Sequence, residues 1–307
     1  MEPAMEPAIR NWVNWLTINR SAATVSGYGW ELRHLAKCFP DKQPGDFNQN
    51  DLLAYLANRR KAGCGDAAIK RTVNALKSFF IFTRQGDSPA VRLPAPRPKK
   101  RLQRTLTFAQ AFAVLAACDT SSPIGARDLA IMTLMLDSGI RAAEACRLTL
   151  DKLDLSNRLF RLVVKGGQEG FGTFSLSTAN CLARWLSIRE GIAATGVASV
   201  FVSIGGLKPG HCLTTDGLRR IFRKVGTAAG LKQFSPHDLR RSFATMTSLL
   251  NAPTRWSQIW GRWGNLQEFE RYTQALMTMQ DKLRGEFERY SPVRAVLGEA
   301  TRDRIEP

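Results

Sequence analysis

A proline-rich stretch near residue 90 is the feature that most constrains how this chain can fold. Prolines stand at positions 89, 94, 96 and 98. Each proline removes a backbone hydrogen-bond donor and fixes one torsion angle, so neither a helix nor a central strand continues through the stretch. The 307 residues therefore divide into two domains, the number expected for a usual domain length of roughly 100–200 residues. We predict domains at 1–90 and 107–307, joined by a linker at 91–106.

The residues before the linker predict a bundle of four helices. Apolar side chains recur every three or four residues, the spacing that places them on one face of a helix. This pattern covers Ile9–Leu16, Thr24–Phe39, Leu52–Ala62 and Ala67–Thr83. Asn50 or Asp51 is the predicted cap of the third helix.

The residues after the linker predict a mainly α domain with a small antiparallel β-sheet. Two strands, Asp154–Val164 and Thr173–Leu176, flank a glycine-rich turn. Helical spacing covers the rest of the domain, in Phe108–Cys118, Ala126–Ser138, Ala179–Gly191, Asp216–Ala229, His237–Leu250, Trp256–Trp260 and Leu266–Arg289.

The charge balance predicts a polyanionic partner, with double-stranded DNA as the first candidate. Forty-four Lys and Arg against 26 Asp and Glu give a net charge of +18, and a surplus of this size attracts a polyanion and releases its counterions. Part of the charge lies in the linker, at Arg97, Lys99, Lys100, Arg101 and Arg104. We predict that this basic linker lies on a phosphate backbone; the alternative is a solvated connector. No lipidation motif favours a membrane surface.

Signals for export, membrane insertion and metal binding are missing from the sequence. The N-terminus has no apolar signal segment, and no run of 18 apolar residues occurs. The protein is therefore predicted to be cytoplasmic and associated with the nucleoid. Six scattered cysteines without a CxxC pair predict free thiols. Neither a metal nor another cofactor is expected.

Three short motifs carry residues suited to phosphate chemistry. In Ser138–Glu144 an arginine, Arg141, follows a glycine and precedes Glu144 by three residues, so a helix starting there would let the carboxylate orient the guanidinium. In Pro236–Arg240, His237 and Arg240 are three apart and share one side of a helix. Far downstream, Trp263 precedes Tyr272 by nine residues. Arginine binds two phosphate oxygens at once and stays charged, so such a site needs no metal.

In this order the motifs resemble those of the tyrosine recombinase family, which includes phage integrases, Cre and the Xer chromosome-dimer resolvases. The resemblance extends to the helical first domain and the basic linker. It implies an N-terminal core-binding (SAM-like) domain and a catalytic domain with a C-terminal exchange helix. Two positions depart from the family pattern: Arg262 replaces a usual glycine, and Arg241 replaces a common histidine.

The resemblance also implies roles for the residues around the phosphate. Arg141 and Arg240 would clamp the scissile phosphate. His237 would hydrogen-bond a phosphate oxygen and accept the tyrosine proton. Trp263 would replace a histidine, donating its indole N–H and packing the site, and Glu144 would support the site from outside.

The resemblance makes Tyr272 the nucleophile, which would form a 3′-phosphotyrosine link with DNA. Lys165, at the turn between the two strands, would protonate the leaving 5′-oxygen. Tyr290 has no Trp or His nine residues before it and is expected to be structural. Arg241 and Arg262 are candidate DNA contacts, with solvated charges as the alternative.

The predicted function is site-specific recombination, with integration and excision of a mobile element favoured over resolution of chromosome dimers or plasmids. The active form is predicted to be a homotetramer of two dimers on DNA, assembled from free monomers. The C-terminal helix either docks on a neighbouring subunit or packs on its own core. The competing functions are DNA relaxation of the type IB topoisomerase kind and DNA binding with a catalytically decayed site. A metal-dependent nuclease lacks its carboxylate cluster.

Overall fold

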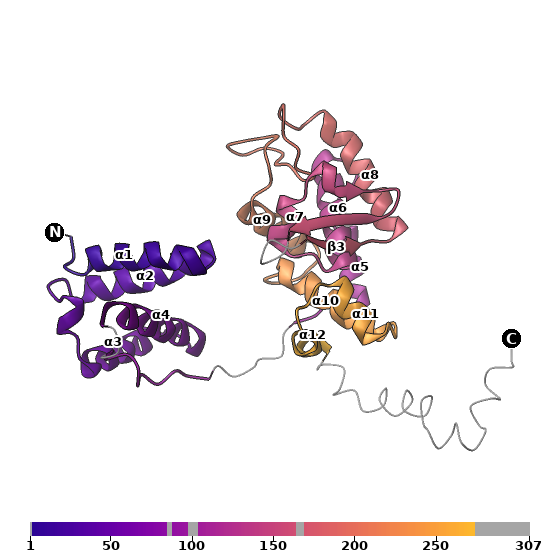
Figure 1. Cartoon of the computed structure of the whole chain (residues 1–307). Helices are drawn as coiled ribbons and strands as arrows, with labels where there is room; N and C mark the ends of the chain where they lie inside the picture. Colours follow the sequence, from indigo (N-terminus) through magenta and orange to yellow (C-terminus); the bar gives the residue numbers. More distant parts are fainter. Residues whose placement is uncertain (1, 85–87, 98–103, 164–168, 274–307) are drawn as a thin grey trace, which may run out of the picture. The chain divides into compact units, whose positions relative to one another are not determined.

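The computed structural model describes residues 2–84, 88–97, 104–163 and 169–273. Its contacts divide the chain into two compact units, Met1–Arg101 and Leu102–Pro307, and the division falls inside the predicted linker. The described chain is mainly helical, with one small antiparallel sheet in the second unit (Figure 1).

The first unit contains the four predicted helices. They are α1 (Glu6–Asn19), α2 (Ala22–Cys38), α3 (Gln49–Lys61) and α4 (Asp66–Arg84), with a 3₁₀ turn, η1 (Pro44–Asp46). The predicted apolar stripe of α1 is buried, with Ile9, Trp12 and Leu16 at its centre. The predicted cap of α3, Asn50 or Asp51, is wrong: Asn48 caps the helix by accepting from the Asp51 backbone N–H, and the Asp51 carboxylate accepts from the Asn48 backbone N–H.

A buried carboxylate joins three helices of this unit. Glu31 on α2 has no exposed surface. It accepts hydrogen bonds from Arg59 of α3 at 3.2 Å and from Arg71 and Thr72 of α4 at 2.8 and 2.9 Å. Because a buried charge is stable only when it is paired, these contacts fix how α2, α3 and α4 pack.

The second unit combines a group of helices with a short three-stranded sheet. Its elements are α5 (Phe108–Ala116), α6 (Pro123–Ser138), α7 (Ala142–Arg147), η2 (Leu150–Lys152), β1 (Leu153–Asp154), β2 (Leu159–Val163), β3 (Glu169–Thr173), α8 (Leu176–Glu190), α9 (Thr215–Ala228), α10 (Pro236–Leu249), α11 (Thr254–Trp260) and α12 (Leu266–Thr273). Helix α6 is the central element: most of its side chains are buried, and it packs against both α8 and α10. The end of the predicted helix Leu266–Arg289 lies outside the described residues.

The sheet differs from the prediction in its strand boundaries. The predicted strand Asp154–Val164 is two strands, β1 and β2, separated by a turn in which Arg158 has a positive φ of 56°. The return strand ends at Thr173 instead of starting there, because Phe160 pairs with Gly172 across the ladder. Strand boundaries follow the partner strand, which a local pattern does not reveal.

Within the described ranges no helix is long and apolar enough to cross a membrane. All six cysteines fall in these ranges, and their thiols are free, as predicted.

Candidate active site

A left-handed glycine turns the chain between α6 and α7 and positions Arg141. Gly139 ends α6 with a φ of +60°, and its backbone N–H closes the last helical turn on Met135. A side chain here would also collide with α10, since a Cβ on Gly139 would lie 2.8 Å from the Phe243 ring. The glycine therefore allows both the turn and the close approach of α10. Two residues later Arg141 becomes the N-cap of α7.

Glu144 holds Arg141 from one turn further along α7, as the sequence predicted. The Arg141 backbone N–H donates to Glu144 Oε2 at 2.9 Å, and Arg141 Nη1 donates to Oε1 at 2.8 Å. Burial by itself would raise the pKa of Glu144. The hydrogen bonds from Arg141, together with the charge of Arg262, outweigh burial and lower the pKa. Glu144 is thus a charged, fixed partner for the guanidinium.

Helix α10 brings the second motif to the same turn. Pro236 occupies its first position, and Ser235 and Asp238 form a capping box, which sets where the helix starts. Arg240 is buried, with 5% of its surface exposed, and its Nη1 donates to the Gly139 carbonyl oxygen. Arg240 therefore lies against the turn that leads into Arg141.

His237 precedes Arg240 by almost one helical turn and keeps an exposed edge. The pKa of its imidazole is lowered from 6.5, first by partial removal from water and then by the positive charges of Arg241, Arg240 and Arg141. Asp238 acts in the opposite direction. In the free protein the ring is therefore neutral at pH 7, the form that can accept a proton.

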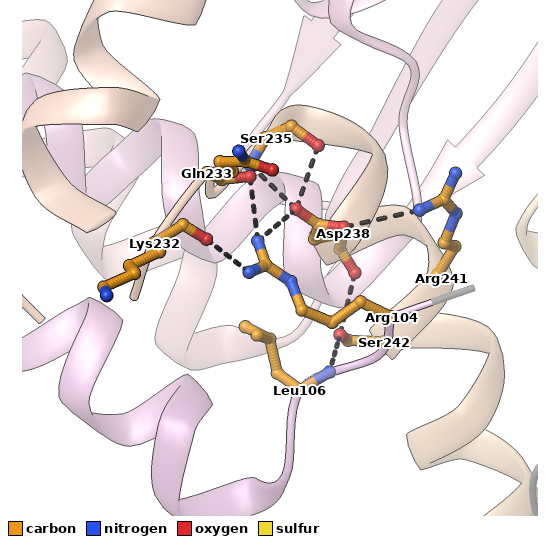
Figure 2. A network of polar contacts seen from close by, with 8 residues as sticks. All are labelled: Arg104, Leu106, Lys232, Gln233, Ser235, Asp238, Arg241 and Ser242. Carbon is orange, nitrogen blue, oxygen red and sulfur yellow. Dashed lines mark hydrogen bonds and ion pairs between the residues drawn. The ribbon is translucent and has the colours of Figure 1, made fainter. Parts of the chain in front are cut away.

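A network around Asp238 fastens the end of the linker to the start of α10 (Figure 2). Arg104 donates to the carbonyl oxygens of Lys232 and Gln233 and, at 2.7 Å, to Asp238 Oδ2. The same Asp238 oxygen accepts from the backbone and hydroxyl of Ser235, at 2.8 and 2.9 Å. The predicted DNA contact Arg104 is therefore engaged in binding its own domain.

A second link in the same network runs through Ser242. Its hydroxyl donates to the Asp238 carbonyl and accepts from the Leu106 backbone N–H, both at 2.7 Å. Residues 104 and 106 are thus attached at two points along α10. Asp238 was not predicted to have a role, although the spacing Ser235-x-x-Asp238 is a capping-box pattern.

Trp263 packs on Arg240. Its ring is 4.3 Å from the Arg240 guanidinium carbon, stacks on Phe243 at 5.9 Å, and meets Phe269 edge-on at 5.2 Å. Gly261 makes this packing possible, because a Cβ there would lie 1.7 Å from the indole. The tryptophan therefore supports the guanidinium by a cation–π contact and by shape.

Of the two remaining predicted catalytic residues, Tyr272 lies within the described residues and Lys165 does not. Tyr272 lies near the end of α12, a helix that packs against α10 and α11. Helix α12 also carries Phe269, which is buried against Trp263. Lys165 lies outside the described residues, in the connection between β2 and β3, whose last pair is Val163 with Glu169.

Arg262, the departure from the family pattern, has a left-handed backbone. Its φ is +55°, a conformation that costs a residue with a side chain about 1–2 kcal/mol and that glycine adopts freely. Its side chain is 8% exposed, so Arg262 is not a solvated charge, and the DNA contact stays a prediction. The side chain is held inward by the Trp260 carbonyl at 2.9 Å and by Glu144 at 3.6 Å.

The remaining predicted DNA contacts include one exposed residue, one partly buried residue and three that lie outside the described residues. Arg97 is exposed, and Arg241 is partly buried, with its Nη1 3.4 Å from Asp238. Lys99, Lys100 and Arg101 lie outside the described residues. Within the described ranges, no three His, Cys, Asp or Glu side chains form a metal-binding group.

Comparison with known families covers both units. The model of the phage integrase family matches residues 104–279, and the model of the phage integrase N-terminal SAM-like domain matches residues 9–86. The chain belongs to the phage integrase family. It is a site-specific DNA recombinase of the tyrosine type, and the predicted SAM-like and catalytic domains are both present.

Sequence relatives agree with this assignment, and solved structures agree with the fold. Tyrosine recombinase XerC of Corynebacterium efficiens is 33% identical over 250 residues, 78% of each chain. XerD of Listeria monocytogenes is 26% identical over 78% of this recombinase and 84% of its own length. The fold matches the Tn1549 transposon integrase in complex with transposon right-end DNA (TM-score 0.70, 17% identity, 92% and 98% covered). It also matches the XerH recombinase bound to difH (TM-score 0.68, 19% identity, 88% and 80% covered).

Proposed function

We propose that this recombinase cleaves and rejoins double-stranded DNA through a covalent 3′-phosphotyrosine intermediate on Tyr272. The observation that supports it is the convergence at the Gly139 turn: Arg240 contacts its carbonyl, Arg141 follows it, and Trp263 packs on Arg240. Two arginines held at one turn can neutralise the charge that builds up on a phosphate under attack.

The chemistry assigns one task to each group. The Tyr272 oxygen attacks phosphorus and its proton passes to His237, whose neutral ring can accept it. The bond from phosphorus to the 5′-oxygen breaks, and Lys165 gives that oxygen a proton. Attack by a 5′-hydroxyl on the phosphotyrosine reverses the steps, so rejoining needs no ATP.

We further propose that strand exchange takes place in a tetramer of two dimers on DNA and serves integration and excision of a mobile element. A specific observation favours a second candidate, the resolution of chromosome dimers: the curated relatives reported above are named XerC and XerD. Mapping the genomic sites that the protein binds would separate them. Sites at the ends of a mobile segment would favour the first, and one chromosomal site the second.

The cleavage step is tested with a suicide substrate, a duplex nicked close to the cleavage position and taken from DNA that flanks the gene. Wild-type protein should form an adduct that survives denaturant and forms in the presence of a metal chelator. Tyr272→Phe should bind the same duplex and form no adduct, while Tyr290→Phe should react like the wild type. An adduct with Tyr272→Phe would move the nucleophile elsewhere. Binding without any wild-type adduct would favour the catalytically decayed DNA-binding protein.

Relaxation of a supercoiled plasmid that lacks the site tests the topoisomerase alternative. The recombinase should leave this plasmid unchanged and should join two labelled duplexes that carry the site. Relaxation without joining would favour type IB topoisomerase chemistry. Binding should also weaken steeply with salt, because phosphate contacts release counterions.

A further inference from the structure

The side chain of Arg262 packs against residues of three elements, α11, β2 and β3. Its Nη1 donates to the Trp260 carbonyl at 2.9 Å, and its guanidinium carbon lies 5.2 Å from the centre of the Phe160 ring on β2. Gly172 of β3 provides the space, since a Cβ there would lie 2.6 Å from Arg262 Nη1 and 2.0 Å from the Phe160 ring. A glycine on the paired strand is therefore required for the arginine to take this position.

Arg262 is connected to Arg141 indirectly, through Glu144, and directly, through a hydrogen bond. Its Nη2 lies 3.6 Å from Glu144 Oε2, the same oxygen that accepts from the Arg141 backbone. Its carbonyl oxygen accepts a hydrogen bond from Arg141 Nη2 at 3.4 Å. Glu144 is thus shared between two guanidinium groups, one of which belongs to the proposed phosphate clamp.

The sharing changes the charge that a phosphate would meet. Arg141 and Glu144 alone sum to zero, so the carboxylate would cancel the cation that it orients. With Arg262 the three side chains sum to one positive charge. Burial makes this addition effective, because charges in a partly dry site are screened less than those in open water.

We infer that Arg262 is a positioning residue of the active site: it balances Glu144 and, with its carbonyl, holds Arg141, so that Arg141 keeps its positive charge available for the scissile phosphate. The inference rests on the proposed function, since it concerns the same phosphate. It also explains why a strained arginine stands where glycine would be relaxed.

The test compares Arg262→Gly, Arg262→Met and Arg262→Lys with a matched control. Arg158 also has a positive φ, at 56°, and is exposed, so Arg158→Gly relieves the same strain without touching Glu144. The measured quantities are the rate of adduct formation at saturating suicide substrate, the Kd for that duplex, and the melting temperature. The Gly and Met variants should react about tenfold more slowly with little change in Kd, the order expected for one partly screened charge. Lys should recover part of the rate, and Arg158→Gly should match the wild type.

Coupling to Glu144 separates a positioning role from a packing role. In a Glu144→Gln background there is no carboxylate to balance, so Arg262→Met should slow the reaction much less than it does alone. The inference is overturned if the Gly and Met variants react within about twofold of the wild type. It is also overturned if the rate loss in the double variant equals the product of the losses caused by Arg262→Met and Glu144→Gln separately.

A readout without catalysis keeps this inference distinguishable from the proposed function. The charge of Arg262 contributes to the lowered pKa of Glu144. Arg262→Met should therefore raise the pKa of the Glu144 carboxyl in a carbon-13 NMR titration of the free protein. If the wild type forms no adduct but Arg262→Met still raises this pKa, the proposed cleavage is overturned and the Glu144–Arg262 coupling stands. An unchanged pKa would overturn the coupling whether or not the protein cleaves DNA.

Discussion

Loss of the Arg104 guanidinium should destabilise the second unit, because Arg104 attaches the end of the linker to α10. Arg104→Met keeps the length and apolar stem of the side chain and removes its charge. It deletes the bonds to the Lys232 and Gln233 carbonyls and to Asp238. The Asp238 side chain is only 5% exposed and loses its shortest bond to a cation.

The expected cost follows from these contacts. A hydrogen bond between charged groups contributes about 1.5–3 kcal/mol when the partner left behind is buried. The two freed carbonyls belong to exposed residues and can bind water, so they add little. Arg104 itself is 38% exposed, which reduces the electrostatic part. We expect about 2 kcal/mol, which corresponds to a melting temperature lower by about 4–8 °C in a unit of this size.

Differential scanning calorimetry measures the change, with the melting of the second unit followed in both proteins. Arg97→Met is the matched control, since Arg97 belongs to the same basic linker and is exposed. It should leave the melting temperature unchanged. Arg104→Met should also slow adduct formation, because α10 carries both His237 and Arg240. A shift of less than about 1 °C would show that the Arg104–Asp238 pair stabilises the unit no more than an ordinary surface ion pair.

Three further predictions concern single residues. Gly261→Ala should push Trp263 off Arg240, cost about 1–3 kcal/mol and slow adduct formation, as measured by thermal melting and by suicide-substrate cleavage. Glu31→Gln should destabilise the first unit by about 3–5 kcal/mol in urea unfolding, because it leaves a buried arginine charge unpaired. His237 should titrate below 6.5 by NMR in the free protein. Between pH 6.5, the pKa of histidine in the unfolded chain, and the lower pKa of the folded protein, mainly the unfolded state binds the proton. The free energy of unfolding therefore decreases as the pH falls through this window.

Each of these predictions has a control. Gly264→Ala adds a Cβ with nothing within 4 Å and should behave like the wild type. Glu2→Gln removes an ion pair whose partners are both 58% exposed and should change unfolding little. The His237 signal is identified by its loss in His237→Gln. The packing argument is contradicted if Gly261→Ala and Gly264→Ala have equal effects. An unshifted urea midpoint for Glu31→Gln contradicts the role of the buried carboxylate, and a His237 pKa above 6.5 contradicts the expected direction of its shift.

Sequence by itself determined the features that depend on nearby residues. Helix spans follow from apolar spacing over a few turns, so the four helices of the first unit and most helices of the second were predicted to within a few residues. The relation of Glu144 to Arg141 was also local, because three residues on a helix bring the two side chains together. Arginines in recognisable motifs, proposed to bind phosphate, therefore led to the family without a structure.

Tertiary structure alone decided which charges face inward and where the strands end. Arg104 belongs to the basic linker, and Arg262 lies between glycine and tryptophan residues along the chain. Both were predicted to be DNA contacts, with solvated charges as the alternative. Their carboxylate partners, Asp238 and Glu144, are more than a hundred residues away in sequence. The limits of β2 and β3 were likewise set by their pairing. Burial of a charge and registry of a strand are properties of a pair of distant segments, and the energy that fixes them exists only after the chain has brought those segments together.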